Sequence, residues 1–334
     1  MKRALFISDV ALSIPSWGSM VQGERSSLGT AESILTQSGF TVSALCCSRP
    51  SCFDFAARKN ENLVFIKKQR DISSLSPNDM QELKSITEDF SAASLLIGEQ
   101  SREKPLEDDT VYTRYGVVAV TSKTFENVLL RGALPLIQTS PGGYYVEIDP
   151  QALKRRRQKL GLSVGEVADI VGISRRTIYG YERGMAKASV PAAYKMIWAL
   201  GIPVARQVNI FERSREPRRA CLLATAKRVF SKNKLLQRMM GKFAKCHMTT
   251  VKRAPFDFVI IASDNRRIVG GVADAKEPEL NRRVDEILSV SKVVNAHPVL
   301  ITEDAHSREK DILCISSKEV AHMNGPEDLI AKVT

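Results

Sequence analysis

The spacing of apolar side chains changes along the chain and predicts three kinds of segment. In the first third, short runs with a period of two residues alternate with runs at the 3.6-residue period of a helix. Strands are expected over residues 40–47, 53–57, 63–66, 94–98 and 116–120, and helices over 27–37, 77–90 and 125–131. Because an element with one apolar face must cover that face, this third is expected to form a layered α/β domain.

The last third repeats this alternation. Strands are expected over residues 247–252, 256–262, 267–272, 298–302 and 312–316, and helices over 231–243 and 279–291. Two short motifs recur at matching places: Phe53-Asp54-Phe55 as Phe256-Asp257-Phe258, and Val120-Thr121-Ser122-Lys123 as Ile315-Ser316-Ser317-Lys318. These correspondences favour a duplicated α/β domain.

The middle of the chain shows mainly helical spacing. Ser163 and Glu166 have the spacing of a capping box, in which the serine hydroxyl accepts a hydrogen bond from the N–H three residues on and the glutamate reaches back. A helix is therefore expected to begin at Ser163 and to end at Gly172, which can adopt a left-handed backbone at no steric cost. Ala168 leaves room for a second helix to cross closely. The larger apolar side chains of this helix are expected to be buried, namely Val167, Ile170 and Val171.

A second helix is expected over residues 174–183, with Ser174 as its N-cap. Ile178 and Tyr181 recur at helical spacing and are expected to be buried. The outward face then carries Arg175, Arg176, Tyr179 and Gly180. Arginines at this end of a helix can meet base edges in a major groove, where a guanidinium bonds guanine bidentately. The alternative interpretation is an ordinary helical hairpin with a solvated basic face.

Residues from Leu153 to about Ile202 resemble the phage-repressor (Cro-type) helix-turn-helix family. The resemblance is carried by Leu160-Gly161-Leu162-Ser163 and Tyr181-Glu182-Arg183-Gly184. It implies that Arg157 pairs with Glu182 and joins the first helix of the bundle to the third. The family usually has a phosphate-contacting Gln where this chain has Val164. A fourth helix, over residues 190–200, is expected to close the bundle.

These observations divide the candidate residues of the bundle into two groups. The residues expected to hold the bundle together are Arg157, Ser163, Glu166, Ala168, Gly172, Ile178 and Glu182. The residues expected to contact DNA are Ser174, Arg175, Arg176, Thr177, Tyr179, Gly180 and, from the first helix, Arg155.

The distribution of charge supports a nucleic-acid partner. The 334 residues carry a net charge of +12. Between Gln151 and Arg219 there are 15 Lys and Arg against 5 Asp and Glu, so this fifth of the chain supplies +10 of the total. A basic stripe that coincides with a groove-binding motif is typical of a DNA-binding protein.

Composition excludes several other classes. No apolar run is long enough to span a bilayer, and the apolar stretch near Met1 is broken by Asp9, so we expect a cytoplasmic protein with no membrane partner. Cys46, Cys47 and Cys52 cluster without CxxC spacing, which favours buried reduced thiols over zinc or disulfides. The sequence contains no phosphate loop, dinucleotide fingerprint or nucleophile elbow, so no cofactor is expected.

A metal-dependent nuclease is the competing hypothesis. The order helix, three strands, helix, strand is similar to restriction-endonuclease-like and junction-resolving folds, which need an Asp at the second strand and an Asp/Glu-x-Lys on the third to hold a divalent ion. Asp54 has no such partner, because the next strand reads Val64-Phe65-Ile66-Lys67-Lys68. Asp257 is followed by Asp274-Ala275-Lys276, but these residues align past the end of the strand. We therefore expect Asp54 and Asp257 to cap strand ends, with no catalytic residue and no metal.

From about Ser27 onward the chain resembles the archaeal family of helix-turn-helix transcriptional regulators. The motifs that carry this resemblance lie at residues 51–58, 112–116, 140–143 and 174–178. It implies a non-enzymatic transcriptional regulator that binds double-stranded DNA, with the transcription machinery as a possible further partner. Because one recognition helix reads few base pairs, we expect a homodimer, joined through residues 134–149 or through the α/β domains.

The expected fold is therefore α/β plus all-α. A central Cro-type helix-turn-helix bundle is flanked by two degenerate restriction-endonuclease-like α/β domains. The expected divisions are a poorly ordered extension (1–27), an N-terminal α/β domain (28–133), a β-hairpin (134–149), the helix-turn-helix domain (150–203), a basic linker (204–219) and a C-terminal α/β domain (220–334).

Overall fold

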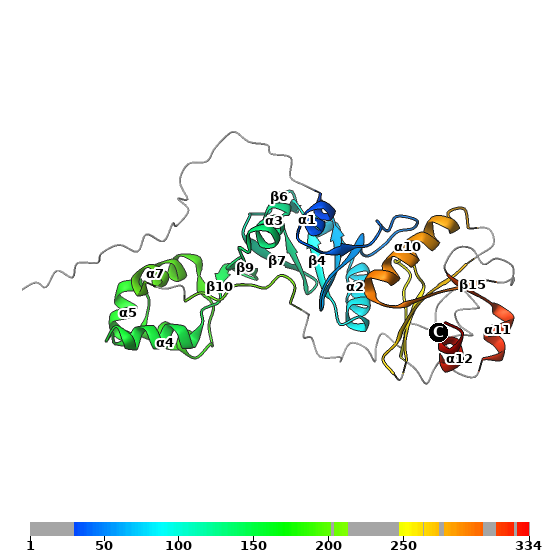
Figure 1. Cartoon of the computed structure of the whole chain (residues 1–334). Helices are drawn as coiled ribbons and strands as arrows, with labels where there is room; N and C mark the ends of the chain where they lie inside the picture. Colours follow the sequence, from blue (N-terminus) through cyan, green and yellow to red (C-terminus); the bar gives the residue numbers. More distant parts are fainter. Residues whose placement is uncertain are drawn as a thin grey trace, which may run out of the picture.

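The computed structural model describes residues 30–201, 204–212, 247–262, 264–273, 277–302, 312–323 and 326–333. The described chain is elongated (Figure 1). The helix-turn-helix bundle lies at one end, the N-terminal α/β domain in the middle and the C-terminal α/β domain at the other end. The expected extension over residues 1–27, the expected helix over 231–243 and the Asp274-Ala275-Lys276 motif lie outside the described residues.

The N-terminal α/β domain follows the predicted order, with a short strand pair and one further strand added before the last strand. Its elements are α1 (Ala31–Gln37), β1 (Thr41–Val42), β2 (Phe55–Lys59), β3 (Asn62–Lys68), the 3-10 helix η1 (Ile72–Ser74), α2 (Pro77–Asp89), β4 (Ala93–Ile97), the short pair β5 (Gln100–Ser101) and β6 (Lys104–Pro105), β7 (Thr110–Arg114), β8 (Val117–Val120) and α3 (Ser122–Arg131). Thr30, Ser76 and Thr121 cap the three α-helices with their hydroxyl oxygens. The expected strand over 40–47 is regular only over β1, and β7 was missed.

Alternate residues of the central strands face two different cores. Phe55 and Ala57 of β2 pack with α1 and α3 on one face of the sheet, whereas Ala56 packs with α2 on the other. This is the period-two alternation that identified the strand in the sequence. β1, β2 and β3 pair antiparallel, and β3, β4 and β8 pair parallel.

The C-terminal α/β domain has the same topology. Its elements are β12 (His247–Thr250), β13 (Phe258–Ile261), β14 (Arg267–Val272), α10 (Leu280–Val294), β15 (His297–Thr302), β16 (Leu313–Ser316), α11 (Ser317–His322) and α12 (Pro326–Val333). The sheet order is β12-β13-β14-β15-β16, antiparallel between the first three strands and parallel between the last three. This is the order and direction of β1-β2-β3-β4-β8. The recurring motif after β8 and β16 supplies in both domains the hydroxyl that caps the next helix, from Thr121 and Ser316.

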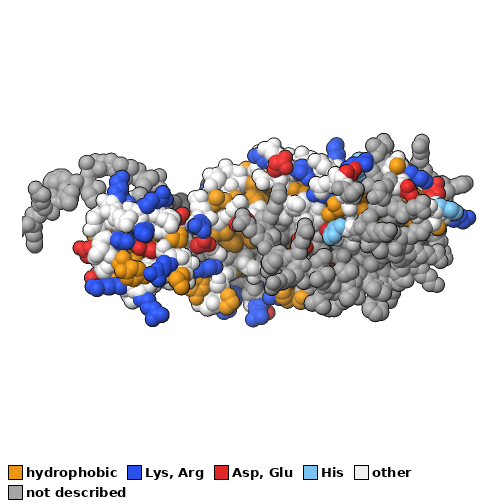
Figure 2. Space-filling model, turned by 90° about the horizontal axis from the view of Figure 1, so that it is seen from below, with side chains coloured by type: hydrophobic (Ala, Val, Ile, Leu, Met, Phe, Trp, Pro, Cys, Tyr) orange, Lys and Arg blue, Asp and Glu red, His pale blue; other side chains and the backbone are white. Residues whose placement is uncertain are grey.

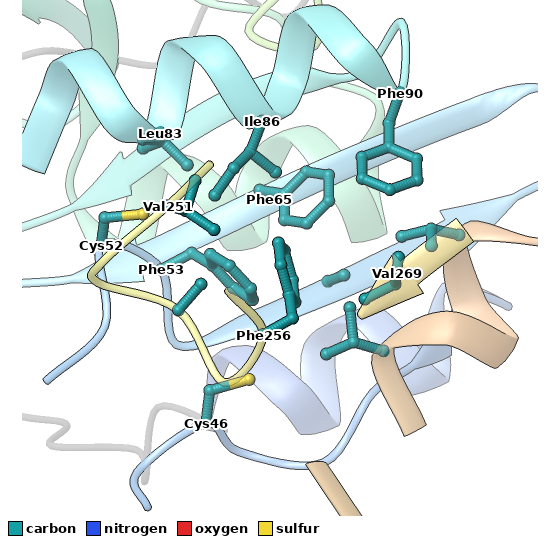
Figure 3. Packing of buried hydrophobic residues seen from close by; sticks show 14 of the residues in the cluster. Cys46, Cys52, Phe53, Phe65, Leu83, Ile86, Phe90, Val251, Phe256 and Val269 are labelled. Carbon is teal, nitrogen blue, oxygen red and sulfur yellow. The ribbon is translucent and has the colours of Figure 1, made fainter. Parts of the chain in front are cut away.

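One core spans both α/β domains. Figure 3 shows Phe53 and Phe65 facing Phe256 and Val269 across the boundary, with Leu83 and Ile86 of α2 above them. The ring centroids of Phe53 and Phe256 are 6.2 Å apart. The expected arrangement, a central helix-turn-helix bundle flanked by the two α/β domains, therefore holds in the sequence but not in space. In space the two α/β domains pack directly on each other, because each presents an apolar surface that the other helps to cover.

The hairpin and a returning segment join the bundle to the N-terminal sheet. The expected hairpin is confirmed as β9 (Ile137–Ser140) and β10 (Gly143–Val146), and β7 pairs with β9. The rest of this region consists of α4 (Pro150–Lys159), α5 (Val164–Val171), α6 (Arg175–Glu182), β11 (Ala188–Ser189), which pairs with β10, and α7 (Val190–Leu200). Together these strands complete a nine-stranded sheet.

The segment after α7 corrects a prediction. Residues 204–212 were expected to begin a basic linker, but Val204 and Ile210 are fully buried. Phe211 packs against Phe40 and Phe125, with ring centroids 6.1 and 6.5 Å away. The apolar side chains in this stretch anchor the end of the bundle in the N-terminal core, so the bundle is held to that domain at both of its ends.

Candidate nucleic-acid interface and the two nuclease-type carboxylates

The local signals that predicted the two helices of the motif are present in the structure. Ser163 accepts a hydrogen bond from the N–H of Glu166 at 3.1 Å, and the Glu166 carboxylate accepts one from the N–H of Ser163 at 2.7 Å. This hydrogen bond from Ser163 lowers the pKa of Glu166. Gly172 ends α5 with φ 77°, and Ser174 caps α6 through the N–H of Thr177 at 3.1 Å. The sequence thus encodes the start and the stop of both helices locally.

The bundle core differs from the prediction at one position. Ala168, Val171 and Ile178 are buried as expected, but Ile170 is 50% exposed. Successive residues of a helix point about 100° apart, so Val167, Ala168 and Val171 already fill the buried face of α5 and Ile170 lies beside it. The remaining core comes from α4, α7 and the hairpin, through residues such as Leu153, Met196 and Val146.

A bidentate ion pair joins α4 to α6. Arg157 Nε and Nη2 donate to the two carboxylate oxygens of Glu182 at 2.6 and 3.0 Å. Arg157 Nη1 also donates to the carbonyl oxygen of Leu162 at 3.1 Å, and the hydrogen bond to Glu182 raises the pKa of Arg157. The pair is mostly buried, which fixes the orientation of α6 on the bundle. The pairing implied by the resemblance is therefore present.

The outward face of α6 carries the side chains expected to contact DNA. Arg175, Arg176 and Tyr179 are exposed. Thr177 is half-buried and its hydroxyl lies 2.8 Å from that of Ser174, so part of its polar capacity is used in the cap. Gly180 is half-buried against the turn that follows, where an added Cβ would lie 3.5 Å from the Cβ of Ala186. The exposed part of this face is therefore cationic at its N-terminal end and aromatic one turn later.

Arg175 leans on the first turn of α5. A Cβ added at Gly165 would lie 2.9 Å from Arg175 Nε and 3.1 Å from its Cζ. The guanidinium thus rests over backbone that only a glycine leaves open, and its direction is set by contact rather than by solvent. Arg176, the next residue, is exposed. The position of Arg175 therefore depends on the glycine at 165.

Arg155 lies on the exposed surface of α4, where its Nε donates to the carbonyl oxygen of Gln151 at 3.2 Å. The neighbouring Arg156 instead donates to the carbonyl oxygen of Leu200 at 2.6 Å and ties α4 to the end of α7. Figure 2 shows Lys and Arg side chains over the lobe at the left, which is the bundle. The part of the basic stripe that lies in the bundle is therefore exposed on its surface.

The first nuclease-type carboxylate, Asp54, is neutralised within its own domain. Lys67 Nζ lies 2.7 Å from Asp54 Oδ1, and the N–H of Lys68 donates to Oδ2 at 2.6 Å. Lys67 also donates to the carbonyl oxygen of Ser51 at 3.1 Å. The third strand has Phe65 and Ile66 two residues before Lys67 and Lys68, so it offers no second carboxylate for a metal ion.

The second carboxylate, Asp257, is neutralised by two arginines. Arg49 Nη2, from the N-terminal domain, lies 2.9 Å from Asp257 Oδ1. Arg283 Nη2 donates to Oδ2, which also accepts the N–H of Val272 at 2.6 Å. The guanidinium of Arg283 is 2% exposed and is held further by Glu277 Oε2 at 2.7 Å. Both aspartates therefore accept a backbone N–H from the third strand, as expected for strand-end capping.

The described residues offer little for metal chemistry. No group of three or more His, Cys, Asp and Glu side chains that could hold a metal ion occurs among them. Burial raises the pKa of the Cys46 and Cys52 thiols, which fits inert reduced cysteines, whereas Cys47 is exposed and departs from the expectation of burial. In the part of the chain that the structure describes, no helix is long and apolar enough to cross a membrane.

Two known families match segments of the chain. Residues 24–135 match the family described as "PD-(D/E)XK superfamily domain", the class of fold to which restriction-type nucleases belong. Residues 153–206 match the family described as "Helix-turn-helix". The first match covers the domain of Asp54, and the second covers α4 to α7 and the start of the returning segment.

Whole-length relatives come from archaea. A protein of Methanococcus vannielii is 32% identical over 91% of this chain and 95% of its own length. A protein of Archaeoglobus fulgidus is 28% identical over 89% of this chain and 94% of its own length. A protein of Methanocella arvoryzae is 32% identical over 89% of this chain and 91% of its own length. Each of the three is named "Putative HTH-type transcriptional regulatory protein".

Proposed function

The chain belongs to the archaeal family of HTH-type transcriptional regulatory proteins, and from this premise we propose that it is a dimeric regulator that reads the major groove of duplex DNA with α6. The observation that carries the proposal is the outward face of α6, where Arg175, Arg176 and Tyr179 are exposed on a helix locked in place by the Arg157–Glu182 pair. A rigid helix with exposed donors at its N-terminal end has the geometry of a recognition helix.

We assign different roles to the basic residues of this surface. Arg175 and Arg176 lie at the N-terminal end of α6 and are placed to reach base edges. Arg155 lies on α4 and is placed to contact the phosphate backbone, which carries no sequence information. Ser174, Thr177, Tyr179 and Gly180 complete the surface that approaches the groove.

Alanine variants test this assignment. Arg175→Ala and Arg176→Ala should each weaken binding to the cognate site by about 1 to 3 kcal/mol and relax base preference. Arg155→Ala should weaken cognate and random duplexes alike and reduce the dependence on salt. The measurement is fluorescence anisotropy on both duplexes over a range of salt concentrations. If all three variants lowered specific and non-specific binding equally, α6 would not be the reading element.

The two-fold contact of the proposed dimer is best placed on α7. Both strands of the hairpin are already paired on both sides, and the apolar surfaces of the α/β domains cover each other. On α7, Tyr194 is 62% exposed and Trp198, one turn later, is 77% exposed. Large aromatic side chains that remain this exposed are typical of an interaction surface, and a second copy of this chain would cover them.

The dimer is tested by sedimentation equilibrium, free and on a duplex with two half-sites about 34 Å apart. Trp198→Glu should shift the protein towards monomer and remove cooperative binding to the paired site. At a concentration at which both proteins are monomeric, the melting temperature should be unchanged, because this exposed side chain contributes little to the bundle core. A protein that is monomeric both free and on its best DNA would exclude the dimer.

A nuclease is the second candidate, favoured by the match of residues 24–135 to the PD-(D/E)XK superfamily. The neutralised aspartates argue against it, because Lys67 at Asp54 and the two arginines at Asp257 occupy positions from which a metal ion would be repelled. We propose that the protein acts without a metal or other cofactor. DNA should be shifted equally well in EDTA and in Mg²⁺ or Mn²⁺. Metal-dependent nicking of linear or branched duplex that is lost in Asp257→Asn would establish the nuclease instead.

A further inference from the structure

Two glutamates, one on α2 and one on α10, make the same kind of contact with the opposite α/β domain. Glu286 of α10 accepts hydrogen bonds from the backbone N–H groups of Cys47 and Ser48 at 2.9 and 2.8 Å. Glu82 of α2 accepts hydrogen bonds from the backbone N–H groups of Lys252 and Arg253 at 3.0 and 2.9 Å. In each case one carboxylate oxygen bridges two consecutive amides across the domain boundary.

The four amides occupy equivalent places in the two domains. Cys47 directly follows Cys46, whose N–H donates to the carbonyl oxygen of Asp54 at 2.7 Å. Lys252 directly follows Val251, whose N–H donates to the carbonyl oxygen of Asp257 at 2.9 Å. Each glutamate therefore binds the segment that follows the first strand of the opposite domain. In both domains this segment is hydrogen-bonded to the aspartate singled out above, Asp54 or Asp257.

The C-terminal ends of α2 and α10 also make matching contacts with the opposite domain. Asp89 lies seven residues after Glu82 on α2, and Val293 lies seven residues after Glu286 on α10. The carbonyl oxygen of Val293 accepts a hydrogen bond from Arg58 at 2.6 Å, and that of Asp89 accepts one from Arg267 at 3.0 Å. Arg58 comes from β2, the first strand of its hairpin, and Arg267 comes from β14, the second strand of the equivalent hairpin. The contacts correspond in position although the residues that make them have diverged.

The centre of the boundary has the same symmetry. Phe53 and Phe256 each precede the nuclease-type aspartate of their domain, and their rings meet in the shared core with centroids 6.2 Å apart. A residue that meets its own counterpart marks an approximate two-fold axis, since only such an axis brings a position next to itself. An arbitrary packing of two unrelated domains would not place equivalent glutamates on equivalent turns.

We infer that the C-terminal α/β domain is a second copy of the nuclease-type domain and that the two copies bind each other as an internal dimer. The surface concerned is the one that each α/β domain turns towards the other, and the partner that it fits is a second copy of the same fold. Within one chain, each copy already covers this surface of the other. The surface is therefore closed to a second chain, and contact between two chains has to be made elsewhere. The inference concerns the α/β domains alone and does not depend on the proposed reading of DNA by α6.

Site-resolved hydrogen exchange on the full chain tests the inference. Glu286→Gln should accelerate exchange at the amides of Cys47 and Ser48 by about tenfold, because a charged acceptor is replaced by a weaker neutral one. Glu82→Gln should do the same at Lys252 and Arg253. Glu103→Gln, at an exposed position in the N-terminal domain, is the matched control and should change neither set.

Thermal unfolding and sedimentation of the same variants complete the test. Both Glu82→Gln and Glu286→Gln should lower one common melting transition, on the order of 5 °C for the buried Glu286 and less for the half-exposed Glu82, without changing the association state. Separate melting of the two domains, or dissociation of a chain dimer without a lower melting temperature, would overturn the inference. If the unmodified protein showed no sequence-specific DNA binding, only the proposed function would be refuted, and the inference about the α/β domains would stand.

Discussion

The helix-turn-helix bundle and the paired α/β domains use their charged side chains in opposite ways. In the bundle, Arg175 and Arg176 point outward without a carboxylate partner among the described residues, so their charge is available to a phosphate or a base. In the α/β domains, Asp54 and Asp257, the two carboxylates on which the nuclease hypothesis depends, are both held by cations. The fold of a nuclease-type domain can thus be kept while its carboxylates serve to hold the domain together.

The two aspartates also differ from each other. Asp54 pairs with Lys67 of its own domain. Asp257 pairs with Arg49 of the other domain and with the buried Arg283. Asp257 therefore contributes to the boundary between the domains, whereas Asp54 stabilises only the hairpin that carries it.

The largest expected effect comes from breaking the shared core. Phe256→Ala removes a fully buried ring that contacts Phe53, and unfolding in urea should show a loss of about 3 to 5 kcal/mol. DNA binding measured well below the melting temperature should be unchanged, because the bundle has its own core. Leu130→Ala, at an exposed position on α3, is the control and should change the stability by less than about 0.5 kcal/mol. A parallel fall in DNA affinity would show that the two regions are not independent.

The next effect separates the two aspartates. Asp257→Asn should cost about 3 kcal/mol, because it leaves the buried Arg283 with only part of its anionic environment. Asp54→Asn should cost about 1 kcal/mol, since Lys67 can turn towards solvent. Urea unfolding measures the loss of stability in both variants. When it is repeated with Mg²⁺, the free energy of unfolding of each variant and of the unmodified protein should not change. Equal losses for the two variants would contradict the difference in role.

A smaller effect is expected at the start of α5. Ser163→Ala should cost about 1 kcal/mol in the stability of the bundle, because it removes the N-cap. The pKa of Glu166 is held below its ordinary value of 4.5 by the hydrogen bond from Ser163, so its contribution is complete above pH 4.5 and is lost as the pH falls through the lowered pKa. Glu166→Gln should flatten this pH dependence, which is followed by amide exchange in the bundle from pH 6 to 3. If the pH dependence of amide exchange were the same in Glu166→Gln, the capping box would not be its cause.

The smallest effect tests how Arg175 is held. Gly165→Ala should stabilise α5 by up to about 1 kcal/mol, because alanine favours helix over glycine. Its Cβ would displace the Arg175 guanidinium, so cognate binding should weaken by less than in Arg175→Ala. A double-mutant cycle with Arg175→Ala measures the coupling. Strictly additive effects would show that Arg175 does not depend on the space at Gly165.

The bundle was predictable because its signals are local. The capping box, the glycine stop and the second cap each act within four residues, and the structure contains all three. The exposed Ile170 shows the limit of this reasoning, because helical spacing alone does not say how wide the buried face is. The returning segment was misjudged because its charged residues obscured Val204, Ile210 and Phe211, which find their partners far away in the chain.

The sequence by itself determined most of the order of the described elements, the caps of α5 and α6, the excess of positive charge in the middle of the chain and the recurrence of short motifs in the two α/β domains. Tertiary structure alone decided that these domains face each other across one core and that Arg49 pairs with Asp257 from the other domain. It also decided that Glu286 accepts hydrogen bonds from two adjacent amides, 238 and 239 residues away in the chain. Short-range hydrogen bonds depend on residues a few positions apart and leave a pattern in the sequence. Contacts between distant segments depend on how complete apolar surfaces fit together, and no local spacing records that fit.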